Sequence, residues 1–132
     1  MIRPVLGLPL ERARQLLREH MEESEYPWAK SHLPILDGSV VFVCMDGEYI
    51  AGYVWFYLLE DDTRTWVVHM SLEEKYRKAA FSRTTANTIF AVCYSLGCDA
   101  ILAESESRAL LRRIGAVETE DGALLRLPYV WR

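Results

Sequence analysis

The apolar residues change their period along the chain, and the first segment has the period of a helix. Between Leu10 and Met21 apolar residues recur every three or four positions, with charged residues on the opposite side. This spacing predicts an amphipathic helix over the segment. Pro27 and Pro34 interrupt the chain that follows, because proline lacks the N–H that a helix or a strand ladder needs. Residues 22–36 are therefore expected to form a second short helix or an irregular loop.

Three segments rich in β-branched and aromatic residues come next, and each is typical of a strand. They run from Val40 to Met45, from Tyr49 to Leu59 and from Thr65 to Leu72. Asp46-Gly47 predicts a tight hairpin turn between the first two, and Gly52 indicates a bulge or a close approach between neighbouring strands. Because the connections are short, we expect an antiparallel meander.

The period becomes helical again after the third strand. The spacing predicts a helix over 79–96 that ends at Gly97. The short segment 100–103 is wholly apolar, which is typical of a strand buried on both faces. We expect it to lie parallel to the strand at 65–72, joined by a right-handed crossover. The apolar stripe of the helix is expected to consist of Phe81, Thr85, Thr88, Ile89, Val92 and Leu96.

The remaining residues predict one more helix and a hairpin. Ser105 or Ser107 is placed to cap a helix that ends at Gly115, and strands at 116–119 and 123–127 flank a turn. The order of elements indicates an α/β protein with a mixed sheet: an antiparallel N-terminal meander, one central βαβ unit and a C-terminal hairpin. With 132 residues, the chain is expected to be one domain.

Composition and charge exclude several classes of protein. Hydrophobic residues make up 51% and charged residues 26% of the chain, which is typical of a globular domain. The longest apolar runs are too short for a membrane helix, and the N-terminus lacks the pattern of a signal peptide. The net charge of −4 argues against nucleic-acid binding, which needs a positive surplus. We expect no nucleic acid and no membrane among the partners, and a cytoplasmic location.

The cysteines and histidines do not have the spacing of a metal site. Cys44, Cys93 and Cys98 form no CxxC pair, and the three histidines lie far apart in the sequence. We therefore expect no metal. The cysteines are expected to be free thiols in the core of a protein from a reducing compartment.

Four segments of the chain resemble the GNAT superfamily, the GCN5-related N-acetyltransferases. Val67–Leu72 is similar to the fourth strand of that family, residues 76–82 to its acyl-CoA signature loop and Asp99–Ala103 to its fifth strand. Residues 110–116 are similar to the ending F-Y-x-K-x-G-F. The order of elements extends the resemblance over about residues 10–127. It implies a GNAT-like fold, acetyl-CoA as the acyl donor, and an amine on a small molecule or a protein as the acceptor.

The signature loop departs from the family pattern Q/R-x-x-G-x-G/A, because this chain has Arg77-x-x-Ala80-x-Ser82. A loop that opens a helix presents unpaired N–H groups and the positive end of the helix dipole, which suit a pyrophosphate. Alanine and serine remain small, and Lys78 and Arg83 add positive charge. The alternative is that Arg77 and Lys78 simply begin a solvated helix. The resemblance implies a cofactor-binding set of Met70, Leu72, Arg77, Lys78, Ala79, Ala80, Phe81, Ser82 and Arg83.

Acyl transfer to an amine needs a polarised thioester carbonyl, a base for the amine and, in many members of the family, a tyrosine that protonates the thiolate. The family tyrosine corresponds to Leu111, which cannot donate a proton. His69, which can titrate near neutral pH, and Glu104, which ends the predicted parallel strand, are the candidate catalytic bases. Each has an alternative as a hydrogen-bonded strand or cap residue. Glu73 and Glu74 are weaker candidates that we expect to face water.

The sequence supports two functions from different classes. The first is an acyl-CoA-dependent N-acetyltransferase. The second is a catalytically inactive GNAT-like protein that serves in binding, phage assembly or host interaction, in the host cytoplasm if a phage encodes it. Alternating bulky residues over 53–57 indicate either a strand buried on both faces or one face that lines an acceptor cleft. The apolar tail 127–132 is expected to contact its own domain or a partner, so a homo-oligomer or a protein partner stays open.

Overall fold

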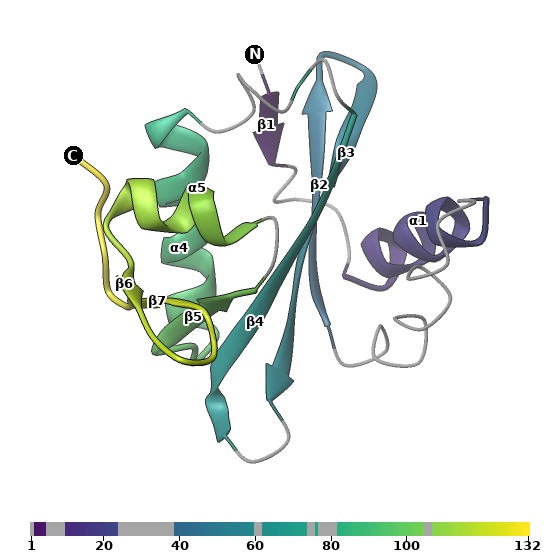
Figure 1. Ribbon diagram of the computed structural model, residues 1–132. Helices are drawn as coiled ribbons and strands as arrows, with labels where there is room; N and C mark the ends of the chain where they lie inside the picture. The colour runs from purple at the N-terminus through teal and green to yellow at the C-terminus, as the bar shows by residue number, and fades with distance from the viewer. Residues whose placement is uncertain are drawn as a thin grey trace.

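The computed structural model describes residues 2–4, 10–23, 39–59, 62–73, 76, 82–104 and 107–132. Its strands form one sheet in the order β1-β2-β3-β4-β5-β7-β6 (Figure 1). The strands are β1 Ile2–Pro4, β2 Val40–Asp46, β3 Tyr49–Leu59, β4 Asp62–Leu72, β5 Ala100–Ala103, β6 Val117–Glu118 and β7 Ala123–Arg126. The helices are α1 Leu10–Glu23, α4 Arg83–Ser95 and α5 Ser107–Ile114.

The predicted topology is confirmed. β2, β3 and β4 form the antiparallel meander, β4 and β5 are the one parallel pair among the described strands, and β6 and β7 form the C-terminal hairpin. Strand β1, which pairs with β2, has no counterpart among the predicted elements, because three residues that include a proline carry no strand period. Residues 22 and 23 belong to α1, and the rest of the predicted second helix or loop lies outside the described residues.

The sheet separates two apolar cores, and β3 contributes to both. Figure 1 shows α1 on one face of the sheet and α4 with α5 on the other. Tyr53 and Trp55 belong to the core beneath α1, whereas Val54 and Phe56 belong to the core beneath α4 and α5. Strand β3 is therefore buried on both faces, which is the first of the two interpretations of its alternating bulky residues. Most of its aromatic residues belong to the two cores.

Helix α4 has the predicted C-terminus but a different buried face. The backbone N–H groups of Gly97 and Cys98 donate to the carbonyls of Tyr94 and Cys93, which is the Schellman ending that a C′ glycine favours. The predicted stripe is wrong in part, because Leu96 is exposed. The helix carries its own apolar residues around much of its circumference, so the hydrophobic period alone could not show which face is buried. The residues that α4 buries are Thr85, Ala86, Ile89, Phe90 and Cys93.

The C-terminal tail contacts its own chain, which is one of the two arrangements expected from its apolar sequence. Leu127 is buried in the core beneath α4 and α5, and Tyr129 and Trp131 lie against that core. No described helix is both long enough and apolar enough to cross a membrane.

We predict that none of the three cysteines reacts with a thiol reagent at pH 8 until the protein unfolds. All three are buried, and burial raises the pKa of Cys44 to about 12 and that of Cys98 to about 11. Unfolded thiols ionise near pH 8.5, so the unfolded state releases protons that the native state keeps, and stability should fall as the pH rises above about 8.5. Ellman titration with and without urea, and urea midpoints from pH 7 to 10, measure both effects. Stoichiometric labelling of the native protein would contradict the prediction.

Candidate functional site

The two central strands separate before β4 ends. The parallel ladder between β4 and β5 runs from Thr65↔Ala100 to Val68↔Ala103. The antiparallel ladder between β4 and β3 continues four residues farther, to Gly52↔Leu72. Over 69–72, strand β4 is therefore bound to β3 on one side and has left β5 on the other. We call the space beside these four residues the β4–β5 gap.

The backbone of Met70 is directed into this gap. The N–H of Glu73 donates to the carbonyl of Ala51, on the β3 side of β4, and the backbone of Trp66 forms a hydrogen bond with Cys98, on the β5 side. The register between 66 and 72 has no irregularity, and successive residues of a strand turn their N–H and C=O groups to opposite sides. Met70 and Leu72 consequently turn these groups toward the gap, where β5 supplies no partner for Met70.

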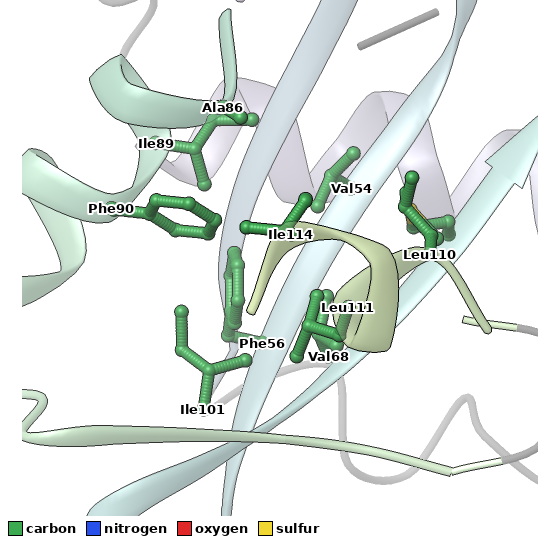
Figure 2. A pocket seen from close by; sticks show the side chains of 11 residues that line it. Val54, Phe56, Val68, Ala86, Ile89, Phe90, Ile101, Leu110, Leu111 and Ile114 are labelled. Atoms are coloured by element: carbon green, nitrogen blue, oxygen red, sulfur yellow. The ribbon is translucent and has the colours of Figure 1, made fainter. Parts of the chain in front are cut away.

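An apolar pocket lies beneath the gap, on the side of α4 and α5 (Figure 2). Its volume is about 30 Å³, which exceeds the roughly 10–15 Å³ that one water needs. All eleven residues that line it have apolar side chains, so the pocket suits a small apolar group rather than a polar one. The lining residues are Val54, Phe56, Val68, Met70, Ala86, Ile89, Phe90, Ile101, Leu110, Leu111 and Ile114.

The N-terminus of α4 is partly satisfied by its own cap. The Ser82 hydroxyl accepts a hydrogen bond from the N–H of Thr85 at 3.1 Å, so one of the free donors of this helix end is occupied. Arg83 is the first helical residue and is exposed. An anion at this end would meet the remaining first-turn N–H groups and the charge of Arg83. Residues 77–81 of the predicted signature loop lie outside the described residues.

The opposite face of the sheet carries aromatic and acidic groups next to the same gap. The His69 ring stacks on Trp55 at 5.3 Å and on Tyr57 at 5.2 Å between ring centroids. His69 follows the last β4 residue that pairs with β5, and Glu104 follows the last β5 residue of that ladder. The two predicted bases therefore lie on adjacent strands where the gap begins.

Burial raises the pKa of two tyrosines on this face, and acidic side chains add to the shift. Burial is the main cause for Tyr57, and the negative charge of Glu104 adds to it, which places Glu104 within electrostatic reach of that ring. Burial is also the main cause for Tyr53, with contributions from Glu19 and Glu23 of α1. Glu19 and Glu23 therefore lie within electrostatic reach of the Tyr53 ring.

The fold can be compared with solved structures, although no protein-family model and no curated protein matches the sequence. A GNAT-family protein of Desulfovibrio desulfuricans has a TM-score of 0.63 at 14% identity, over 96% of this chain and 98% of its own. A GNAT-family N-acetyltransferase of Escherichia coli, solved in complex with CoA, has a TM-score of 0.61 at 22% identity, over 96% and 81%. The yncA protein of Salmonella typhimurium, solved with acetyl-CoA, has a TM-score of 0.57 at 14% identity, over 96% and 93%. The chain has the GNAT fold.

Within the GNAT fold, the weaker sequence candidates do not come together at the gap. Glu73 accepts a hydrogen bond from the Tyr49 hydroxyl on an exposed surface, and Glu74 lies outside the described residues. Tyr94, which the sequence does not nominate as a replacement for the missing tyrosine, is half exposed on α4 and does not line the pocket. Leu111, at the position of that tyrosine in the resemblance, is buried and lines the pocket.

Three residues of the site are not singled out by the sequence. In the sequence, Tyr57 is only one of several aromatic residues of its strand, and nothing in the sequence shows that it stacks on His69. Phe90 is absent from the predicted stripe of α4, although it lies four residues after Ala86 and three before Cys93, which are buried with it. Ile114 directly precedes Gly115, and a buried apolar residue before a helix-ending glycine is the signal that could have identified it.

Proposed function

We propose that this protein transfers an acetyl group from acetyl-CoA to the nitrogen of an amine. The observation that carries the proposal is the two-sided gap at the end of the β4–β5 ladder. An apolar pocket opens on one face, and a histidine and a carboxylate lie on the other face. A donor and an acceptor that approach from opposite faces can meet there without competing for space.

The described residues fit an acyl-CoA thioester. The Met70 N–H, directed into the gap, is a donor for the thioester carbonyl oxygen. The pocket beneath it suits the apolar end of the acyl group. The first turn of α4 offers backbone N–H groups and Arg83 offers a positive charge, both of which suit a phosphate. We propose that they form a phosphate site together with Arg77, Lys78, Ala79, Ala80 and Phe81.

The chemical step needs one base and does not require a protein acid. The amine nitrogen attacks the thioester carbon, the C–S bond breaks, and the amine proton passes to a base. We propose His69 as that base, with Glu104 as the charge that attracts a protonated amine to the gap. The leaving thiolate takes its proton from solvent, since Leu111 has no proton to give. A thiolate is stable enough in water for such a step.

The second candidate is a GNAT-fold protein that binds a partner without catalysis. Three departures from the family pattern favour this candidate. Leu111 stands where the family has a tyrosine, Ala80 stands where the signature loop has a glycine, and Ser82 stands where it has a glycine or an alanine. A homo-oligomer or a protein partner on the aromatic face or the tail belongs to this candidate. It predicts no thiol release from acetyl-CoA with any amine, and co-purification with a protein.

Isothermal titration and thiol release distinguish the two. Acetyl-CoA should bind and should release CoA only when an amine is added, with the native cysteines silent toward Ellman's reagent. A protein that gives no heat at millimolar acetyl-CoA and releases no thiol with a panel of small amines and lysine peptides does not have the proposed activity.

We predict that Arg77→Glu weakens CoA binding by at least about 1 kcal/mol, because it replaces a charge-assisted hydrogen bond to phosphate with a repulsion. Arg126→Glu is the matched control, since Arg126 is exposed and pairs with Ala100 at the far end of β5. Titration with CoA measures both affinities. Equal affinities for the two variants would place the phosphates away from the signature loop.

A further inference from the structure

The C-terminal tail contacts both helices that form one side of the apolar pocket. The Tyr129 hydroxyl donates a hydrogen bond to the carbonyl of Ile114, at the end of α5. Its ring also meets the ring of Phe90 on α4 edge-on, with 6.2 Å between centroids and 73° between planes. Phe90 and Ile114 both line the pocket, and Figure 2 shows both side chains turned into it. One residue of the tail thus holds two pocket residues from two different helices.

A second pair of bonds fixes the tail to α4. The side-chain amide of Asn87 donates to the Trp131 carbonyl at 3.0 Å and accepts from the Trp131 N–H at 2.8 Å. Such a two-way pairing replaces the ladder that a neighbouring strand would provide, because it satisfies both backbone groups of one residue. The tail is therefore held one turn before Phe90 by Asn87 and directly at Phe90 by Tyr129.

The end of α5 is shaped to receive the tail. Gly115 follows Ile114 with a φ of 129°, in the region that favours glycine. A Cβ atom at this position would collide with the Tyr129 hydroxyl and lie 3.2 Å from its Cζ atom. The glycine thus both ends the helix and leaves the space that the tyrosine occupies.

We propose that residues 129–131 act as a brace that sets the width of the pocket and thereby limits the donor to a short acyl chain. This inference rests on the proposed function. The braced pocket has about 30 Å³, room for about two water-sized groups, which matches an acetyl group and not a chain with two further methylenes. Tyr129 and Asn87 are positioning residues, because they act through Phe90 and Ile114 and do not line the pocket themselves.

The test compares acetyl-CoA with butyryl-CoA in Tyr129→Phe and in the double variant Asn87→Ala/Tyr129→Phe. Thr88→Ala is the matched control on α4, because its hydroxyl bonds within the helix, to the carbonyl of Thr84. The ratio of kcat/KM for acetyl-CoA to that for butyryl-CoA should fall at least tenfold in the double variant and less in Tyr129→Phe. It should stay unchanged in Thr88→Ala. An unchanged ratio in both brace variants overturns the proposal.

Xenon binding tests the brace without acyl-CoA. Apolar cavities of proteins take up xenon, and the methyl resonances of Ile89, Leu111 and Ile114 report on this pocket. Loosening the brace should raise the xenon affinity at least threefold over that of Thr88→Ala, and equal affinities would overturn the brace. If the wild-type protein turns over neither acyl-CoA, the proposed function fails, and the xenon titration still decides whether the tail sets the pocket width.

Discussion

Met70→Pro is expected to lower kcat/KM for acetyl-CoA by about 10²–10³, the usual effect of removing one donor to a developing oxyanion. Proline deletes the backbone N–H that Met70 directs into the β4–β5 gap. The bonds from β4 to β3 belong to the neighbouring residues His69 and Ser71, because N–H groups alternate between the two sides of a strand. The substitution therefore removes the proposed donor and leaves the β3 ladder in place, because proline is tolerated where the N–H that it replaces makes no ladder hydrogen bond.

Two variants of the same strand serve as controls. Met70→Leu keeps the N–H and nearly the same apolar volume, so its kcat/KM should stay close to that of the wild type. Ser71→Pro deletes an N–H on the β3 side, so it should lower the urea midpoint far more than Met70→Pro does. Steady-state thiol release and urea unfolding measure the two effects. If folded Met70→Pro stays within threefold of Met70→Leu, the thioester carbonyl is polarised elsewhere.

The fold could be predicted from local sequence signals wherever one period dominates. The meander followed from β-branched segments joined by Asp46-Gly47, and the parallel pair followed from a wholly apolar segment after a long helix. The hydrophobic period did not predict the structure correctly where it was ambiguous, as in α4, or absent, as in β1. Helix α4 has apolar residues around much of its circumference, and only the packed structure shows that Phe90 is buried and Leu96 is exposed. Strand β1 is too short to show a period.

The candidate site was predictable in part, for a different physical reason. Glu104 directly follows the wholly apolar segment 100–103, and His69 and Met70 lie in the second half of the predicted strand 65–72, so the sequence alone assigns all three to the two central strands. Stacking of Tyr57 on His69 depends on the register between β3 and β4, which sequence patterns do not specify to the residue. The brace from Tyr129 to Ile114 joins positions 15 residues apart through a tail that has no periodic structure.

Gly52→Ala is expected to destabilise the protein by about 3 kcal/mol, near the upper end for a single overpacking change. A Cβ atom on Gly52 would collide with the carbonyl oxygen of Ser71 and would lie 2.8 Å from the Cα atom of Leu72. Both atoms belong to the backbone of β4, so the clash can be relieved only by moving β3 away from β4. The predicted close approach at Gly52 is thus present in the structure, next to a register shift between β2 and β3.

Gly47→Ala separates this steric effect from the conformational cost of losing a glycine. Gly47 has a φ of 61°, and a Cβ atom added to it would meet nothing within 4 Å, so alanine there should cost only about 1–2 kcal/mol, the penalty of the left-handed conformation. Urea unfolding at pH 7 gives both free energies of unfolding.

Because Gly52 pairs with Leu72 at the far end of the β4–β5 gap, Gly52→Ala should also reduce acetyl-CoA affinity under conditions where it remains folded, whereas Gly47→Ala should not. Equal effects of the two alanines on stability and on affinity would mean that β4 can shift at no cost, and that the gap does not depend on the close packing of β3 against it.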